Sequence, residues 1–118
     1  MTMMNESGSD IEQIEMSIQE AQRTIDLGKS LDRLNTNKDF TKIFLEGYLE
    51  KEAIRLVHLK SDPAMSTPEM QADVIRSIDA IGITRSYLIM IMQKAAMAER
   101  AVNDYHEELK VALTEDSE

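Results

Sequence analysis

The sequence contains no cysteine and no tryptophan, and its 118 residues include only two prolines and four glycines. Without cysteine, the chain has no disulfide, no thiolate zinc site and no cysteine nucleophile. So few prolines and glycines do not suit a chain of short strands joined by turns. The remaining residues are mostly strong helix formers, and 42% of the chain is apolar. This composition predicts an all-α protein with a packed core.

The formal net charge is −9, and the acidic residues gather at the two ends of the chain. Residues 1–26 and 103–118 each carry a net charge of −5, whereas residues 27–102 carry +1. Acidic ends repel phosphate, and no broad basic face is available to bind it. The charge pattern therefore does not favour a nucleic-acid partner.

The longest uninterrupted apolar run extends only from Tyr87 to Met92. A membrane span needs roughly 20 such residues, so we expect no membrane contact. Residues 1–8 have neither the basic nor the apolar stretch of a signal peptide. The absence of cysteine fits a reducing compartment.

A first helix is predicted over about residues 10–34, after a flexible tail over residues 1–8. Ser9 and Glu12 have the spacing of a capping box, which marks a helix start. Apolar residues then recur at intervals of three and four, the pattern of a heptad seam that pairs with one or two other helices. We expect this seam to be a protein-interaction surface, with packing inside the chain as the alternative. Its residues are Ile11, Ile14, Ile18, Ala21 and Ile25.

The heptad phase changes near Gly28. Continuing the seam would place Gly28 and Asp32 inside, whereas Leu27, Leu31 and Leu34 form an apolar stripe on a rotated face. Glycine in a helix interior costs about 1 kcal/mol relative to alanine. The pattern therefore predicts a kink or short break near Gly28.

Two further helices, over about 38–60 and 68–112, are predicted to pair as a hairpin. Thr67 has the chemistry of an N-cap, and Pro68 suits the first helical position. The row of apolar residues along the last helix also takes in Arg85, Glu99 and His106, and Gly82 leaves a break there undecided. The predicted hairpin core consists of Phe40, Phe44, Tyr48, Val57, Val74, Ile78, Ile81, Leu88 and Met92.

These elements predict an elongated antiparallel helical hairpin plus an N-terminal helix, with coiled-coil-like packing. We expect a single helical domain over residues 9–113, followed by an acidic flexible tail over 114–118. An unbroken last helix would extend roughly 66 Å, well beyond the roughly 13 Å radius of gyration of a compact domain of this size. We therefore expect the chain to self-associate.

No residue pattern indicates catalysis, a cofactor or a metal. Neither His58 nor His106 follows a glutamate by three residues, the spacing used in di-metal helical bundles. The chain also lacks a phosphate-binding glycine loop and a nucleophile elbow. We predict that the protein is not an enzyme and that it has no catalytic, cofactor-binding or metal-binding residues.

One concentration of basic residues interrupts the otherwise mixed surface. It consists of Lys29, Arg33, Lys38 and Lys42, with no interleaved aromatic platform on which bases could stack. A solvated turn is the interpretation that this pattern favours. The alternatives are contact with nucleic acid and contact with an acidic partner.

The segment Lys38 to Leu49, continued by Glu52 to Val57, resembles a family of small tailed-bacteriophage proteins. The segments Asp62 to Met65, Ile78 to Gly82 and Met97 to Glu99 resemble it too, so that the similarity covers about residues 10–105. Genes of such proteins often lie near capsid and portal genes. The resemblance implies a phage setting and virion assembly, and it supplies no activity and no binding residues.

These observations together predict a non-enzymatic phage virion or assembly protein that acts through helix-mediated self-association and protein binding. Its expected partners are copies of itself and other phage structural proteins, in the host cytoplasm during infection and in the virion. An acidic inhibitor of a host nucleic-acid-processing enzyme is the alternative, because carboxylates can occupy sites that bind phosphate.

Overall fold

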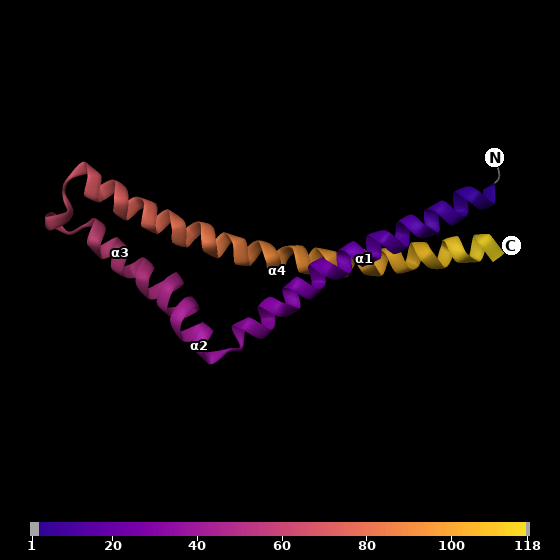
Figure 1. Ribbon diagram of the computed structural model, residues 1–118, viewed down its shortest axis with the longest axis horizontal. Coiled ribbons are helices and arrows are strands. Elements are labelled where there is room, and N and C mark those ends of the chain that lie inside the picture. The colour runs from indigo at the N-terminus through magenta and orange to yellow at the C-terminus, as the bar shows by residue number, and fades with distance from the viewer. Residues whose placement is uncertain (1–2, 118) are drawn as a thin grey trace. The chain divides into compact units, whose positions relative to one another are not determined.

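The computed structural model describes residues 3–117, with side chains described from residue 8 to residue 115. These residues form an all-α protein. Its elements in chain order are α1 (Met3–Asn35), α2 (Lys38–Phe40), the π-helix η1 (Thr41–Glu52), α3 (Ala53–Lys60), the 3₁₀ turn η2 (Pro63–Met65) and α4 (Pro68–Ser117) (Figure 1).

Contacts between residues divide the chain into two compact units. Unit 1 contains the chain up to Ser30 together with the chain from Ile91 onward, and unit 2 contains Leu31–Met90. The sequence pattern predicted one helical domain over residues 9–113. The division arises because α4 contributes to both units, with α3 as its partner in unit 2 and α1 as its partner in unit 1.

Unit 2 is built around an antiparallel pair, α3 and the first half of α4, joined through η2 (Figure 1). Its buried core is formed by Leu56 from α3 with Val74 and Ile81 from α4. Half-buried apolar residues complete the cluster: Tyr48, Leu49, Ala53, Leu59, Met65 and Ile78. Four predicted core residues, Tyr48, Val74, Ile78 and Ile81, therefore belong to this cluster.

Side-chain caps define the corners of unit 2. Asn37 Oδ1 accepts a hydrogen bond from the Phe40 amide at 3.0 Å, and Thr67 Oγ1 accepts one from the Met70 amide at 3.2 Å. These bonds satisfy amides that have no partner inside their own helix. Gln71 Nε2 donates to the carbonyl oxygens of Lys60 at 2.9 Å and Met65 at 2.6 Å, which ties the η2 turn to the start of α4.

Three of the predicted core residues, Phe40, Phe44 and Tyr48, form an aromatic stripe along α2 and η1. Phe40 and Phe44 stack with ring centroids 5.1 Å apart, and Phe44 and Tyr48 lie 5.5 Å apart at a tilted angle. Phe40 and Phe44 are half-buried. Because ring pairs at these separations attract each other, the stripe supports the wide π-helical segment along its length.

The prediction for Val57 is wrong. Val57 is 55% exposed, and its neighbour Leu56 is buried with 5% exposed. The π-helix η1, which contains Phe44 and Tyr48, precedes α3 directly, and its i to i+5 hydrogen bonds place more residues in each turn than an α-helix does. A prediction that assumes 3.6 residues per turn throughout η1 therefore selects the wrong residue of α3, Val57 in place of its neighbour Leu56.

The prediction for Met92 is wrong for a related reason. The packed row of α4 advances by three residues after Ile81, to Thr84, instead of by four to Arg85. This change places Ile91 in the row and leaves Met92 51% exposed. From Ile81 onward the packed residues alternate at intervals of three and four, and we call this row the inner seam: Ile81, Thr84, Leu88, Ile91, Ala95, Ala98, Val102, Tyr105, Leu109 and Ala112.

The inner seam avoids the polar residues that the predicted row had to include. Arg85, Glu99 and His106 are all exposed, so no charge loses its hydration. Thr84 satisfies its hydroxyl by donating to the Ala80 carbonyl oxygen at 2.8 Å. The predicted core residue Leu88 lies in this seam and is half-buried.

The predicted break near Gly28 is also wrong, because α1 continues through it as one helix. Gly28 is buried, and a Cβ built on it would lie only 2.4 Å from Ala95 Cβ on α4. The missing side chain thus allows close approach of two helices within unit 1. Leu31 is buried as the rotated stripe implied, whereas Leu27 and Leu34 of that stripe are exposed.

The helix ends differ from the predicted boundaries. Within the described residues α1 already begins at Met3, so Ser9 and Glu12 lie inside the helix instead of at its start. The predicted tail over 1–8 is helical from Met3, and residues 1–2 lie outside the described residues. At the other end α4 passes unbroken through Gly82 and continues to Ser117, and residue 118 of the predicted acidic tail lies outside the described residues.

The contact between Gly28 and Ala95 predicts opposite effects for two glycine-to-alanine substitutions. Gly28→Ala should lower the free energy of unfolding by about 1–3 kcal/mol, because the new methyl group forces the helices apart. Gly82→Ala should raise it by about 1 kcal/mol, since nothing lies within 4 Å of its Cβ position and alanine favours the helix. Urea denaturation followed by circular dichroism measures both. Stabilisation by Gly28→Ala would contradict the close approach, and Ala95→Gly should restore stability in the Gly28→Ala background.

The core of unit 2 predicts a sharp difference between two adjacent positions on α3. Leu56→Ala should lower the free energy of unfolding by about 2–5 kcal/mol, because it leaves a cavity between α3 and α4. Val57→Ala should change it by less than about 0.5 kcal/mol, because Val57 is exposed. Thermal and urea denaturation of the two variants provide the measurement. Equal effects at the two positions would mean that α3 presents a different face to α4.

Candidate protein-interaction surface

The five residues of the predicted interaction seam lie on the side of α1 that faces α4 within unit 1. Ile25 is buried with 6% exposed, and Ile11, Ile14, Ile18 and Ala21 are half-buried. Gly28 continues their spacing of three and four and touches Ala95 of the inner seam. The structure therefore uses this seam for contact inside the chain, which was the alternative left open by the sequence.

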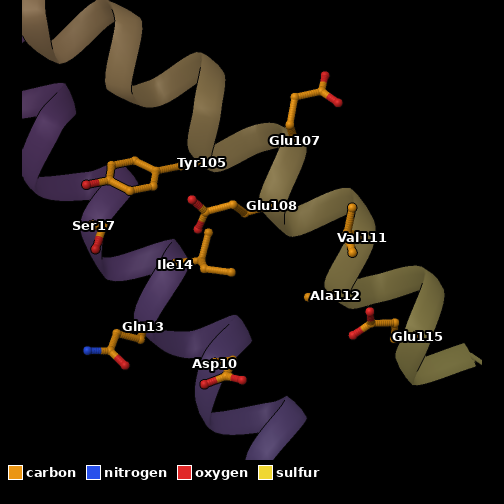
Figure 2. Close-up of a pocket in the computed structure, with 10 residues that line it drawn as sticks. All are labelled: Asp10, Gln13, Ile14, Ser17, Tyr105, Glu107, Glu108, Val111, Ala112 and Glu115. Atoms are coloured by element: carbon orange, nitrogen blue, oxygen red, sulfur yellow. The ribbon is translucent and has the colours of Figure 1, made fainter.

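A groove opens between the two helices of unit 1 where α1 begins and α4 ends (Figure 2). Its volume is about 670 Å³. From α1 it is lined by Asp10, Gln13, Ile14 and Ser17, and from α4 by Tyr105, Glu107, Glu108, Val111, Ala112 and Glu115. In Figure 2 the Tyr105 ring extends from α4 toward α1, near Ser17, and Ile14 points into the space between the helices. The small Ala112 and Ser17 leave this part of the packing incompletely filled.

The groove is acidic. Four carboxylates line it, those of Asp10, Glu107, Glu108 and Glu115, and no basic residue does. Lys110 lies outside the lining and pairs with Glu107 at 3.6 Å between Nζ and Oε1. All these carboxylates are exposed to solvent. The groove therefore repels phosphate and other anions, and its apolar floor suits an apolar or cationic side chain.

A second row of residues on α4 has the same heptad spacing as the inner seam and is largely open to solvent. We call it the outer seam, and its residues are Ile83, Tyr87, Met90, Lys94, Met97 and Ala101. Ile83 is 71% exposed and Met97 63% exposed, and Ala101 is half-buried. If the inner seam is assigned heptad positions a and d, the outer seam occupies c and g. A helix with two such rows can pair with one helix on each.

The outer seam was not predicted from the sequence. Its signal was present in the nearly all-round apolar character of residues 87–98. The predicted row included Met92. With Met92 in that row, the remaining apolar residues of α4 showed no regular spacing. With the inner seam placed at Ile91, the remaining apolar residues separate into the second row.

The other exposed apolar side chains are dispersed over the helices. Ile43 on η1 borders a shallow depression together with Gly47 and Tyr48, and Lys51, Glu52 and Arg55 form its polar side. Arg55 donates to both carboxylate oxygens of Glu52, which lowers the pKa of Glu52 and raises that of Arg55. Because Arg55 is exposed and Glu52 is only half-buried, water still screens this pair, and it contributes little to stability.

His58 and His106 are both exposed, on α3 and α4. Among residues 3–117, no group of three or more His, Asp or Glu side chains is arranged to hold a metal ion. In the same part of the chain, no helix combines the length and apolar character needed to cross a membrane.

Comparison of the chain with known proteins finds no matching family model, no matching curated protein and no matching solved structure. The resemblance to tailed-bacteriophage proteins therefore stays a prediction. The two seams and the acidic groove are the observations from which a function has to be argued.

The position of Ile25 predicts that the α1 seam stabilises the single chain. Ile25→Ala should lower the free energy of unfolding by about 2–5 kcal/mol, and by the same amount at low and at high protein concentration. Leu27→Ala, two residues away and exposed, should change it by less than about 0.5 kcal/mol. Urea denaturation at two protein concentrations tests this. An effect of Ile25→Ala that depends on concentration would assign the α1 seam to contacts between molecules.

Proposed function

We propose that the chain is a non-enzymatic protein of virion structure or assembly that acts by helix-mediated self-association and by binding other phage structural proteins. The observation that carries this proposal is the outer seam of α4, a regular and mainly apolar row that is largely exposed among the described residues. Exposed rows of this kind mark surfaces for protein contact. The phage setting comes from the sequence resemblance, and it implies the host cytoplasm and the virion as locations.

The character of the exposed apolar residues supports a role in protein binding. Among the residues whose side chains are described, five methionines are exposed: Met16, Met70, Met90, Met92 and Met97. Methionine is unbranched and adapts to irregular surfaces, and it is abundant on surfaces that bind more than one partner. Such a surface suits a protein that contacts first its own copies and then other components during assembly.

The acidic groove of unit 1 favours a second candidate function, inhibition of a host nucleic-acid-processing enzyme. Its carboxylates could occupy a basic site that normally binds phosphate. This candidate needs salt-sensitive binding to a basic enzyme, and it needs no self-association.

The proposal predicts that the protein is present in purified phage particles or in immature proheads. Quantitative mass spectrometry of both particles should give a constant ratio of this chain to the major capsid protein across gradient fractions. An abundant host protein of similar mass, measured in the same fractions, is the control for contamination. Presence in proheads alone would identify an assembly factor. Absence from both particles would contradict the proposal and favour a free protein that acts on the host.

A further inference from the structure

We infer that the outer seam is the contact surface between two copies of this chain, which pair with their α4 helices antiparallel and centred at the level of Met92. This inference deepens the proposed self-association and rests on it. The seam is defined above by Ile83, Tyr87, Met90, Lys94, Met97 and Ala101.

The spacing of the outer seam selects a helix as its partner. Its residues alternate at intervals of four and three over 18 positions, about 27 Å of helix. A row with a period of 3.5 residues stays in contact with another helix when the two wind around each other with a left-handed twist. A strand or a compact loop would follow such a row for only one or two turns.

An antiparallel pair centred at Met92 matches the seam residues of one copy with those of the other. Ile83 lies level with Ala101 of the second copy, and Tyr87 lies level with Met97. The large Ile83 thus faces a small residue, and the Met97 sulfur faces an aromatic ring, which is a favourable contact. Met90 lies level with Lys94, whose methylene groups can cover it while the ammonium group stays in water.

Other arrangements of the same two helices match less well. A parallel pair places Lys94 against Lys94 and Glu108 against Glu108. Sliding the antiparallel pair by one heptad in one direction places Lys94 against Ile83 of the second copy. Sliding it in the other direction places Asp104 against Tyr87. The arrangement centred at Met92 is therefore favoured by both its apolar contacts and its charges.

The charges beyond the apolar part of the seam agree with this arrangement. Arg76 lies seven residues before Ile83, and Glu108 lies seven residues after Ala101. Arg76 of one copy lies level with Glu108 of the other. Both are exposed, and Arg76 also pairs with Asp73 on its own helix. Asp79 near Arg76 and Glu107 beside Glu108 each add a negative charge at the same ends of the row. The charge of Glu107 is already paired with Lys110 of the same helix at 3.6 Å. In this arrangement each end of the row brings Arg76 of one copy level with Glu108 of the other.

Sedimentation equilibrium of purified full-length chain tests the surface. The wild-type chain should form dimers, and Met97→Glu should raise the dissociation constant by about tenfold or more, because it places a carboxylate in the apolar contact. Met92→Glu is the matched control, since it makes the same change on the same helix at a similarly exposed residue outside the outer seam. It should leave the dissociation constant unchanged. Circular dichroism confirms that both variants remain helical.

A substitution that strengthens the dimer separates the proposed contact from general damage to the fold. Lys94→Leu replaces the one charged residue of the row by an apolar residue. It should lower the dissociation constant by about tenfold. A dissociation constant that rises or does not change would overturn the placement of Lys94 inside the contact.

Disulfide trapping tests the antiparallel register, and the absence of native cysteine leaves no background. Chains with Ile83→Cys mixed with chains with Ala101→Cys should form a cross-linked heterodimer. Neither variant should cross-link to itself, because like positions lie roughly 27 Å apart along the helix. Self-cross-linking of either variant would overturn the antiparallel arrangement.

The outcomes distinguish this inference from the proposal on which it rests. If the chain associates but Met97→Glu and Met92→Glu weaken it equally, the outer seam is the wrong surface and self-association stands. If the wild-type chain stays monomeric at high concentration, the inference fails together with self-association. The presence of the protein in particles is then decided independently by mass spectrometry.

Discussion

The packing of this protein depends on one row of side chains along α4, the inner seam, which repeats at intervals of three and four residues. In unit 2 the row begins at Ile81, next to Val74, and packs against Leu56 of α3. In unit 1 it includes Ile91, Ala95 and Ala98, which are buried. A row of this kind is only one or two residues wide. Each residue of the seam therefore makes a large share of the contacts between α4 and the helix packed against it.

The narrowness of the inner seam has a direct consequence for the surface. Among the described residues, eight apolar side chains are buried and sixteen large ones are exposed. Single exposed apolar residues are ordinary on proteins, but six positions of α4 repeat with heptad spacing, and five of them are apolar. Regular spacing distinguishes the outer seam from dispersed exposure. The same geometry that gives α4 one intrachain partner per unit therefore leaves room for another helix beside it.

Charge has a smaller part in holding the fold together. The ion pairs of the described residues, Arg55 with Glu52, Arg76 with Asp73 and Lys110 with Glu107, are pairs three residues apart on one helix. Solvated pairs of this kind contribute little to stability, and no charged side chain is buried among residues 8–115. Charge instead determines which partners are excluded, since the acidic groove repels anions, and it contributes to the register proposed for the outer seam.

The sequence by itself determined the helical class, the caps at Asn37 and Thr67 and the start of α4 at Pro68, because these follow from local propensity and from hydrogen bonds between near neighbours. It also determined most of the core of unit 2 through Val74, Ile78 and Ile81. Only the tertiary structure decided which neighbour of an adjacent pair is buried, Leu56 or Val57, and Ile91 or Met92. That choice depends on the width of the π-helix η1 and on one step of three residues at Thr84, which local patterns leave open. The role of Gly28 was likewise decided in three dimensions, because a missing side chain is a weakness in an isolated helix and a point of close contact only when Ala95 lies opposite.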